Sequence, residues 1–135
     1  MRKIIYSRAD GGVSVVSAPF DTDEAIETAR AKLPADAIGP RIVDELAVPA
    51  DRTFRNAWKQ NGFVIEHDMP KARDIQEQRI KDSQRMKIRD ILEREVLGEN
   101  VIAEKASVRA LNPRALVDSA TSADELKAIF PAILR

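Results

Sequence analysis

The feature that most constrains the fold is a long stretch in the second half of the chain without glycine or proline. Between residues 71 and 95, 14 of 25 residues are charged, and the next glycine is Gly98. Glu77 lies four positions before Lys81, an acid-first spacing that stabilises helices. The sequence therefore predicts one long charged helix over residues 70–97, about 40 Å in length at a rise of about 1.5 Å per residue.

Apolar residues are sparse in the first half of this helix and dense in the second. They form neither one clean stripe nor a strict heptad, so the sequence does not predict a long coiled coil. We expect that the chain itself cannot cover the sparse half, which would then project into solvent or pack on copies of itself or on a partner. The candidate oligomer seam consists of Ile75, Ile80, Met86, Ile88, Ile91 and Leu92.

The first part of the chain has a different pattern, with short β-branched segments separated by turns. Residues 3–8 and 13–17 flank an Asp-Gly-Gly turn, which predicts a hairpin. In that hairpin Ile4 and Tyr6 share one face, and Ile5 lies on the other.

A helix and a third strand follow this hairpin. Residues 21–24 resemble a capping box with acids in the first turn, and Pro34 ends the helix that they begin. Residues 41–44 form a third short strand in this prediction. The prolines at the junctions support this division into elements.

Residues 51–73 hold the only Trp, the only His and two of the four Phe. The pair Asn61-Gly62 predicts a second hairpin, with Trp58 on the incoming arm. Phe63 and Ile65 would then face the same way. The spacing of Phe54 and Trp58 fits either a single helical turn or a short strand, and it leaves both open.

These aromatic residues are candidates for packing or for partner binding. If Trp58 is buried, it anchors a core, whereas an exposed Trp58 would be a binding anchor. The candidate residues are Phe54, Arg55, Trp58, Phe63 and Ile65.

After the long helix, the sequence predicts short helices that fold back on its dense half. Gly98 is a suitable C-cap, and residues 100–111 follow as a helix. Asn112 and Pro113 begin a short turn, and residues 122–130 form a helix with a capping box.

The predicted fold class is α+β. Residues 1–68 form a small antiparallel sheet of four or five strands with one helix, which would act as a docking unit. Residues 69–135 form a helical region.

The composition excludes several kinds of site. The chain has no Cys, which excludes disulfides, zinc thiolates and thiol nucleophiles. His67 lies between two acids that would point away from it on a strand, and no second His exists. We predict no catalytic residues, no metal, no cofactor and therefore no enzyme.

Charge and hydropathy bear on two further classes of protein, those that bind nucleic acids and those that span membranes. The formal net charge is zero, and the basic run at residues 79–89 is interrupted by acids, which argues against nucleic-acid binding. No apolar run approaches the roughly 20 residues that a membrane span requires.

Six segments of the chain form a recognisable set of motifs. They are residues 10–13 (DGGV), 51–58 (DRTFRNAW), 61–62 (NG), 68–69 (DM), 71–73 (KAR) and 121–127 (TSADELK). Together they resemble a family of small proteins encoded among the tail and tail-fibre genes of tailed bacteriophages and prophages. The likeness is weakest over residues 85–111.

The resemblance implies a setting rather than a reaction. It implies a virion protein, assembled in the host cytoplasm, that contacts other tail or fibre proteins. We expect a non-enzymatic structural or adaptor protein that self-associates as a trimer or another cyclic assembly. The alternatives are an assembly chaperone for a fibre protein and a small DNA-binding regulator.

Overall fold

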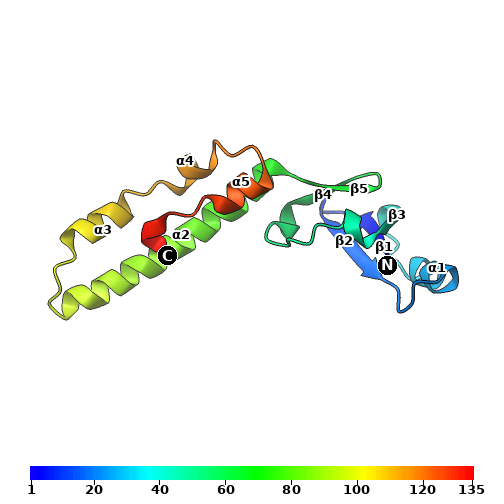
Figure 1. The fold of residues 1–135 in the computed structure, drawn as a ribbon, viewed down its shortest axis with the longest axis horizontal. Helices are drawn as coiled ribbons and strands as arrows, with labels where there is room; N and C mark the ends of the chain where they lie inside the picture. The colour runs from blue at the N-terminus through cyan, green and yellow to red at the C-terminus, as the bar shows by residue number, and fades with distance from the viewer. The chain divides into compact units, whose positions relative to one another are not determined.

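The computed structural model describes residues 1–135 as two compact units, Met1–Asp68 and Met69–Arg135 (Figure 1). The predicted α+β fold class is confirmed. The first unit contains β1 (Arg2–Ser7), β2 (Val13–Ser17), α1 (Asp23–Ala31), β3 (Ile38–Asp44), β4 (Trp58–Asn61) and β5 (Val64–His67). The second contains α2 (Met69–Val96), α3 (Ile102–Arg109), α4 (Pro113–Val117) and α5 (Ala123–Ala128). Three short 3-10 turns complete the chain: η1 (Glu45–Ala47), η2 (Arg55–Ala57) and η3 (Ala132–Leu134).

The first unit is built on a three-stranded antiparallel sheet of order β2-β1-β3. The predicted first hairpin is present, with a three-residue loop between its arms. The Arg8 N–H donates to the Gly12 carbonyl at 2.8 Å, and the Gly11 N–H donates to the Arg8 carbonyl at 3.0 Å. Gly11 has a φ of 85°, the left-handed conformation that this kind of loop requires.

Both faces of this sheet are apolar, and a different element covers each. On one face Ile4 packs with Ala18 and with Ile26 of α1. On the other face Ile5 packs with Trp58 and Ile65 of the β4–β5 hairpin. The alternation predicted for Ile4 and Ile5 is therefore confirmed.

The second hairpin forms a separate two-stranded sheet rather than extending the first. Trp58 lies opposite His67, and Asn61 lies opposite Val64, so the connecting residues are Gly62 and Phe63. Residues 54–59 combine both possibilities left open by the sequence, because the helical turn η2 leads directly into β4.

The prediction that Phe63 belongs to the returning strand is wrong. Of the two connecting residues only Gly62 has a positive φ, 63°, as in a turn that starts with glycine, so the loop is shifted by one residue and includes Phe63. The Phe63 side chain is 60% exposed, and the Arg41 guanidinium lies 5.4 Å from its ring centroid.

The third strand begins three residues before its predicted start at residue 41, because the sequence analysis took Pro40 as a boundary. β3 is an edge strand, where proline is tolerated. Its pairing with β1 also shifts register between Ile5 and Ser7, and Gly39 there has a φ of 58°.

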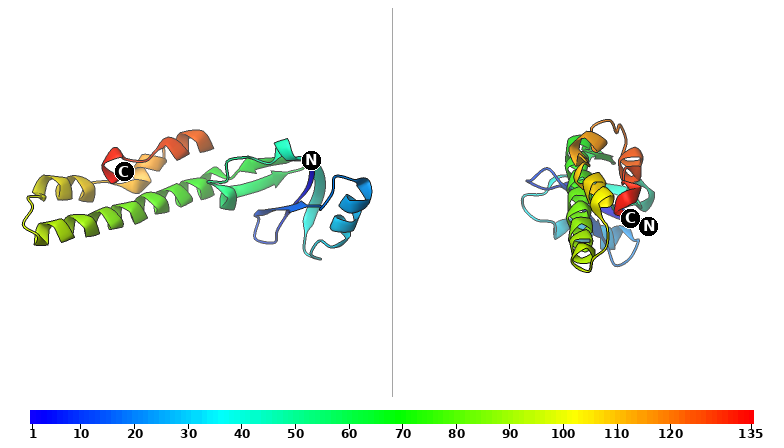
Figure 2. Two further views of the ribbon diagram at one scale, coloured as in Figure 1. Left: turned by 60° about the horizontal axis from the view of Figure 1, so that its bottom comes forward. Right: turned by 90° about the vertical axis from the view of Figure 1, so that its left-hand side faces the viewer.

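In the second unit the chain after α2 returns along that helix, as Figure 1 and the left view of Figure 2 show. Ile91 of α2 packs with Val101 and with Val108 of α3 in a small core. The long helix differs from its predicted bounds by one residue at each end. None of the helices combines the length and the apolar character needed to span a membrane.

The burial of Trp58 gives the first prediction. Its side chain is 1% exposed and packs within the first unit, so Trp58→Ala should lower the free energy of unfolding by about 3–5 kcal/mol. Urea denaturation followed through the NMR signal of the Ile5 amide would measure this change. Phe63→Ala is the matched control and should cost less than about 1 kcal/mol. Equal costs for the two variants would contradict this packing.

Candidate protein-binding surfaces

An apolar groove lies between β2 and α1 in the first unit, with a volume of about 510 Å³. Its inner wall is formed by Ala25 and Ala29 of α1 and by Leu33, which follows the helix, and Val16 of β2 also lines the groove. The two alanines are too short to fill the space beside the sheet. We call this space the β2–α1 groove.

The outer rim of the groove is a second stripe, formed by Glu24 and Thr28 of α1 and by Lys32, the C-cap residue of that helix. These residues are spaced by four and therefore lie one above another on the helix. Glu24 and Lys32 are exposed and take part in none of the ion pairs of the protein. One end of the rim is thus negative and the other positive.

The loop at the entrance to α1 carries Phe20, which is 68% exposed and also lines the groove. Arg2 fixes this loop, since its guanidinium pairs with Asp21 and Asp23 at 2.7 Å each. The hydrogen bond from Arg2 lowers the pKa of Asp21 below its ordinary value. The Thr22 side chain accepts the Ala25 N–H and caps the helix.

The residues predicted around the aromatic cluster separate into buried and exposed groups. Phe54, Trp58 and Ile65 are buried, and the Phe54 ring meets His67 edge to face at a centroid distance of 6.4 Å. Arg55 and Phe63 are exposed. Trp58 is consequently a core residue and does not offer an exposed binding anchor.

The candidate oligomer seam on α2 is not one continuous free surface. Ile80 and Ile91 are fully buried within the monomer, and Ile75 and Ile88 are partly buried. Met86 and Leu92 are exposed. A seam that uses all six residues would require the second unit to open.

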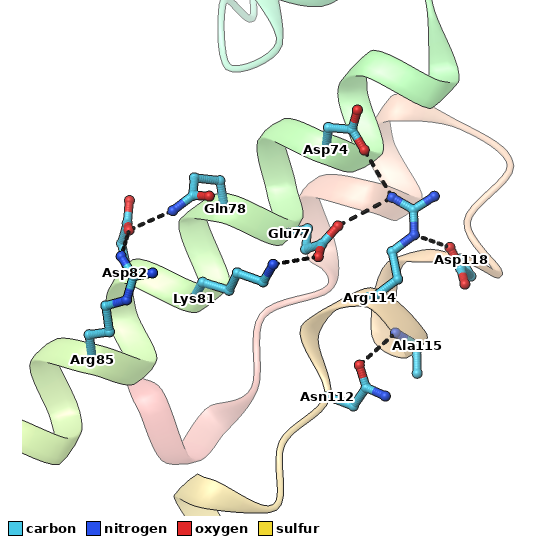
Figure 3. A network of polar contacts seen from close by, with 10 residues as sticks. All are labelled: Asp74, Glu77, Gln78, Lys81, Asp82, Arg85, Asn112, Arg114, Ala115 and Asp118. Carbon is cyan, nitrogen blue, oxygen red and sulfur yellow. Dashed lines mark hydrogen bonds and ion pairs between the residues drawn. The ribbon is translucent and has the colours of Figure 1, made fainter.

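The expectation that the chain cannot cover the sparse half of α2 is wrong, because the returning segment packs on it and buries Ala72, Gln76 and Ile80, in part through polar contacts. Arg114 of α4 pairs with Asp74 at 2.9 Å and with Glu77 at 3.2 Å, both on α2 (Figure 3). Glu77 also forms an ion pair with Lys81 at 2.8 Å. The hydrogen bond from Lys81, with a further one from Arg114, lowers the pKa of Glu77.

Side chains of α2 also bind main-chain carbonyls of the returning segment. Gln76 is 1% exposed, and its amide donates to the Ile129 carbonyl at 2.7 Å. Arg73 donates to the Ala120 carbonyl at 2.9 Å. Gln84 donates to the Val108 carbonyl at 2.8 Å. A hydropathy pattern does not reveal such cover, because the contacting residues of α2 are polar.

An exposed apolar cluster remains at the far end of α2. Val96, Leu97 and Ile102 flank the turn at Gly98, and each is at least three-quarters exposed. We call these three residues the helical tip. Large apolar residues that stay exposed near one turn are candidates for an interaction surface.

The basic run of α2 is mostly neutralised by neighbouring side chains. Lys81 pairs with Glu77, Arg85 lies 3.5 Å from Asp82, and Lys87 lies 3.7 Å from Glu104. These three pairs reduce the positive charge that the face offers to a phosphate backbone. No group of three or more acidic or histidine side chains is placed to hold a metal ion.

The sequence analysis missed the β2–α1 groove. Its one visible signal was Phe20, an aromatic residue between a proline and the acids that begin a helix. In the sequence these residues indicate only a boundary between elements.

No protein-family model, curated protein or solved structure matches this chain.

The buried amide of Gln76 gives the second prediction. Gln76→Ala would leave the Ile129 carbonyl without its donor, so it should lower the free energy of unfolding of the second unit by about 1–3 kcal/mol. Urea denaturation followed by circular dichroism would measure the change. Gln78→Ala is the matched control, because Gln78 is exposed and bonds only to Asp82 on the same helix. It should cost less than about 0.5 kcal/mol. Equal losses would show that the amide does not anchor the returning segment.

Proposed function

We propose that this chain is a non-enzymatic structural or adaptor protein of the tail or fibre region of a bacteriophage, and that it works by binding other proteins. The observation that carries the binding role is the presence of an exposed apolar surface on each compact unit. These surfaces are the β2–α1 groove with Phe20 and the helical tip. The phage setting rests on the sequence resemblance at residues 51–58 and 68–73.

The polar character of α2 supports an interaction role over a nucleic-acid role. Three side chains of its basic run, Lys81, Arg85 and Lys87, are paired with acids, and the exposed apolar residues of the two units are the surfaces that a protein partner would bury. The alternative is an assembly chaperone for a fibre protein, which would use the same surfaces but leave the finished particle.

Mass spectrometry of purified phage particles tests this proposal. We expect peptides of this chain at a constant ratio to the tail proteins after repeated density-gradient purification. Host proteins of similar abundance in the lysate serve as the control for carry-over. Loss of the chain during purification, while it persists in lysates with unassembled fibre protein, would favour the chaperone and contradict the structural role.

We also propose that the protein self-associates, through the helical tip rather than through the candidate oligomer seam. Light scattering at micromolar concentration should give a multiple of the 15.0 kDa chain mass, and Leu97→Glu should reduce it to that of the monomer. Met86→Glu is the matched control, since Met86 is an exposed apolar residue of α2 outside the tip. A stable monomer of the unaltered chain would contradict self-association.

A further inference from the structure

The β2–α1 groove lies beside an edge strand whose outer side is open. The sheet order places β1 on one side of β2 and no strand on the other. The Arg8 N–H donates to the Gly12 carbonyl, and hydrogen-bonded pairs alternate along an antiparallel ladder. The backbone N–H and C=O groups of Ser14 and Val16 therefore point toward β1. The backbone groups of Val15 and Ser17 therefore point away from the sheet.

The two edges of the sheet differ in how they are protected. β3 contains Gly39 and Pro40 and has a register shift, and the Gln60 amide donates to the Gly39 carbonyl at 2.8 Å. Such features prevent a further strand from pairing. β2 contains neither glycine nor proline, and only its first residue, Val13, has a carbonyl that accepts from a side chain, that of Arg8. The edge beside the groove is thus the one that can accept another strand.

A strand added to β2 would project alternate side chains toward α1. Its residue opposite Val16 would face the apolar wall of Ala25, Ala29 and Leu33. An apolar side chain at that position would fill the groove. The backbone of the added strand would form hydrogen bonds with the outward backbone groups of Val15 and Ser17. Main-chain pairing of this kind supplies affinity, and the side-chain pockets supply specificity.

The charges on the rim of the groove indicate which side chains the added strand needs on either side of its apolar residue. Glu24 and Lys32, the C-cap residue of α1, are eight residues apart, which corresponds to about 12 Å at the rise of a helix. Two positions that are four residues apart on an extended strand are separated by about 14 Å, and because four is even, their side chains face the same way. A strand with charged residues two positions before and two positions after its apolar residue therefore matches both ends of the rim.

The direction of the added strand follows from the topology. β2 and β3 are both antiparallel to β1, so α1 must run back from the end of β2 to the start of β3, opposite to β2. Glu24 is consequently near the Ser17 end, and Lys32 is near the Val13 end. A strand antiparallel to β2 would meet Glu24 first and Lys32 last.

We propose that the β2–α1 groove binds an extended segment of a partner protein as a fourth strand, antiparallel to β2, with the pattern basic–x–apolar–x–acidic. The basic side chain pairs with Glu24, the apolar one enters the groove opposite Val16, and the acidic one pairs with Lys32. This inference deepens the proposed function, since it specifies the chemistry of one partner contact.

Fluorescence anisotropy with the purified full chain tests the pattern. The probes are four labelled nine-residue peptides with Lys and Glu at the charged positions and Val, Ile, Leu or Phe at the apolar one. Four further peptides with Lys and Glu exchanged are the controls. At least one matched peptide should bind about tenfold more tightly than its exchanged counterpart, because two favourable exposed ion pairs become two repulsive ones.

Two protein variants make the test specific. The double variant Glu24→Lys, Lys32→Glu should reverse the preference, and both positions are exposed and unpaired, so the fold should tolerate it. Ser17→Pro removes an outward N–H from the open edge and should abolish binding. Circular dichroism of each variant checks that its secondary structure is unchanged.

Three results would overturn the inference. One is the absence of binding by all eight peptides, and another is binding that neither variant alters. The third is a dimer of the free chain that Ser17→Pro dissociates, which would assign the open edge to a second copy. Because these measurements use only the purified chain, their outcome is independent of whether the chain is found in virions.

Discussion

A sheet that is apolar on both faces must be covered twice, and this requirement organises the first unit. Ile4 and Ile5 are neighbours in sequence, yet they are buried in different cores. α1 covers the first of these faces and the β4–β5 hairpin, through Trp58, covers the second. Neither cover is large, which explains why the single Trp carries much of the burial in a chain with 4% aromatic residues.

The second unit differs from the first, because its central helix has few apolar residues to bury. α2 binds the returning chain through side-chain amides and guanidinium groups, as the contacts of Gln76 and Arg114 demonstrate, as well as through the small apolar core around Ile91. Buried polar contacts depend strongly on geometry, since an unpaired partner in the interior costs more than the bond itself gains. The polar contacts therefore fix the position of the returning segment along α2, and the apolar core adds burial.

The surfaces available for partners lie where these covers end. α1 presents alanines beside β2, so the cover leaves a groove at the edge of the sheet. The last turn of α2 extends beyond its buried apolar residues, so Val96 and Leu97 stay exposed. In both places the exposed apolar surface follows from incomplete cover, and the proposed adaptor role uses that surface.

The sequence by itself determined the element types, both hairpins, the long helix and the α+β class, because capping boxes, glycine turns and residue alternation act over a few neighbouring residues. Only the tertiary structure decided that Trp58 is buried, that Phe63 is in a turn, and that Ile80 and Ile91 are covered within the chain. The groove could not be predicted from the sequence either, since its walls come from β2 and α1 and its charges from two ends of one helix. Local signals depend on adjacent residues, whereas burial depends on which distant segment packs against a side chain.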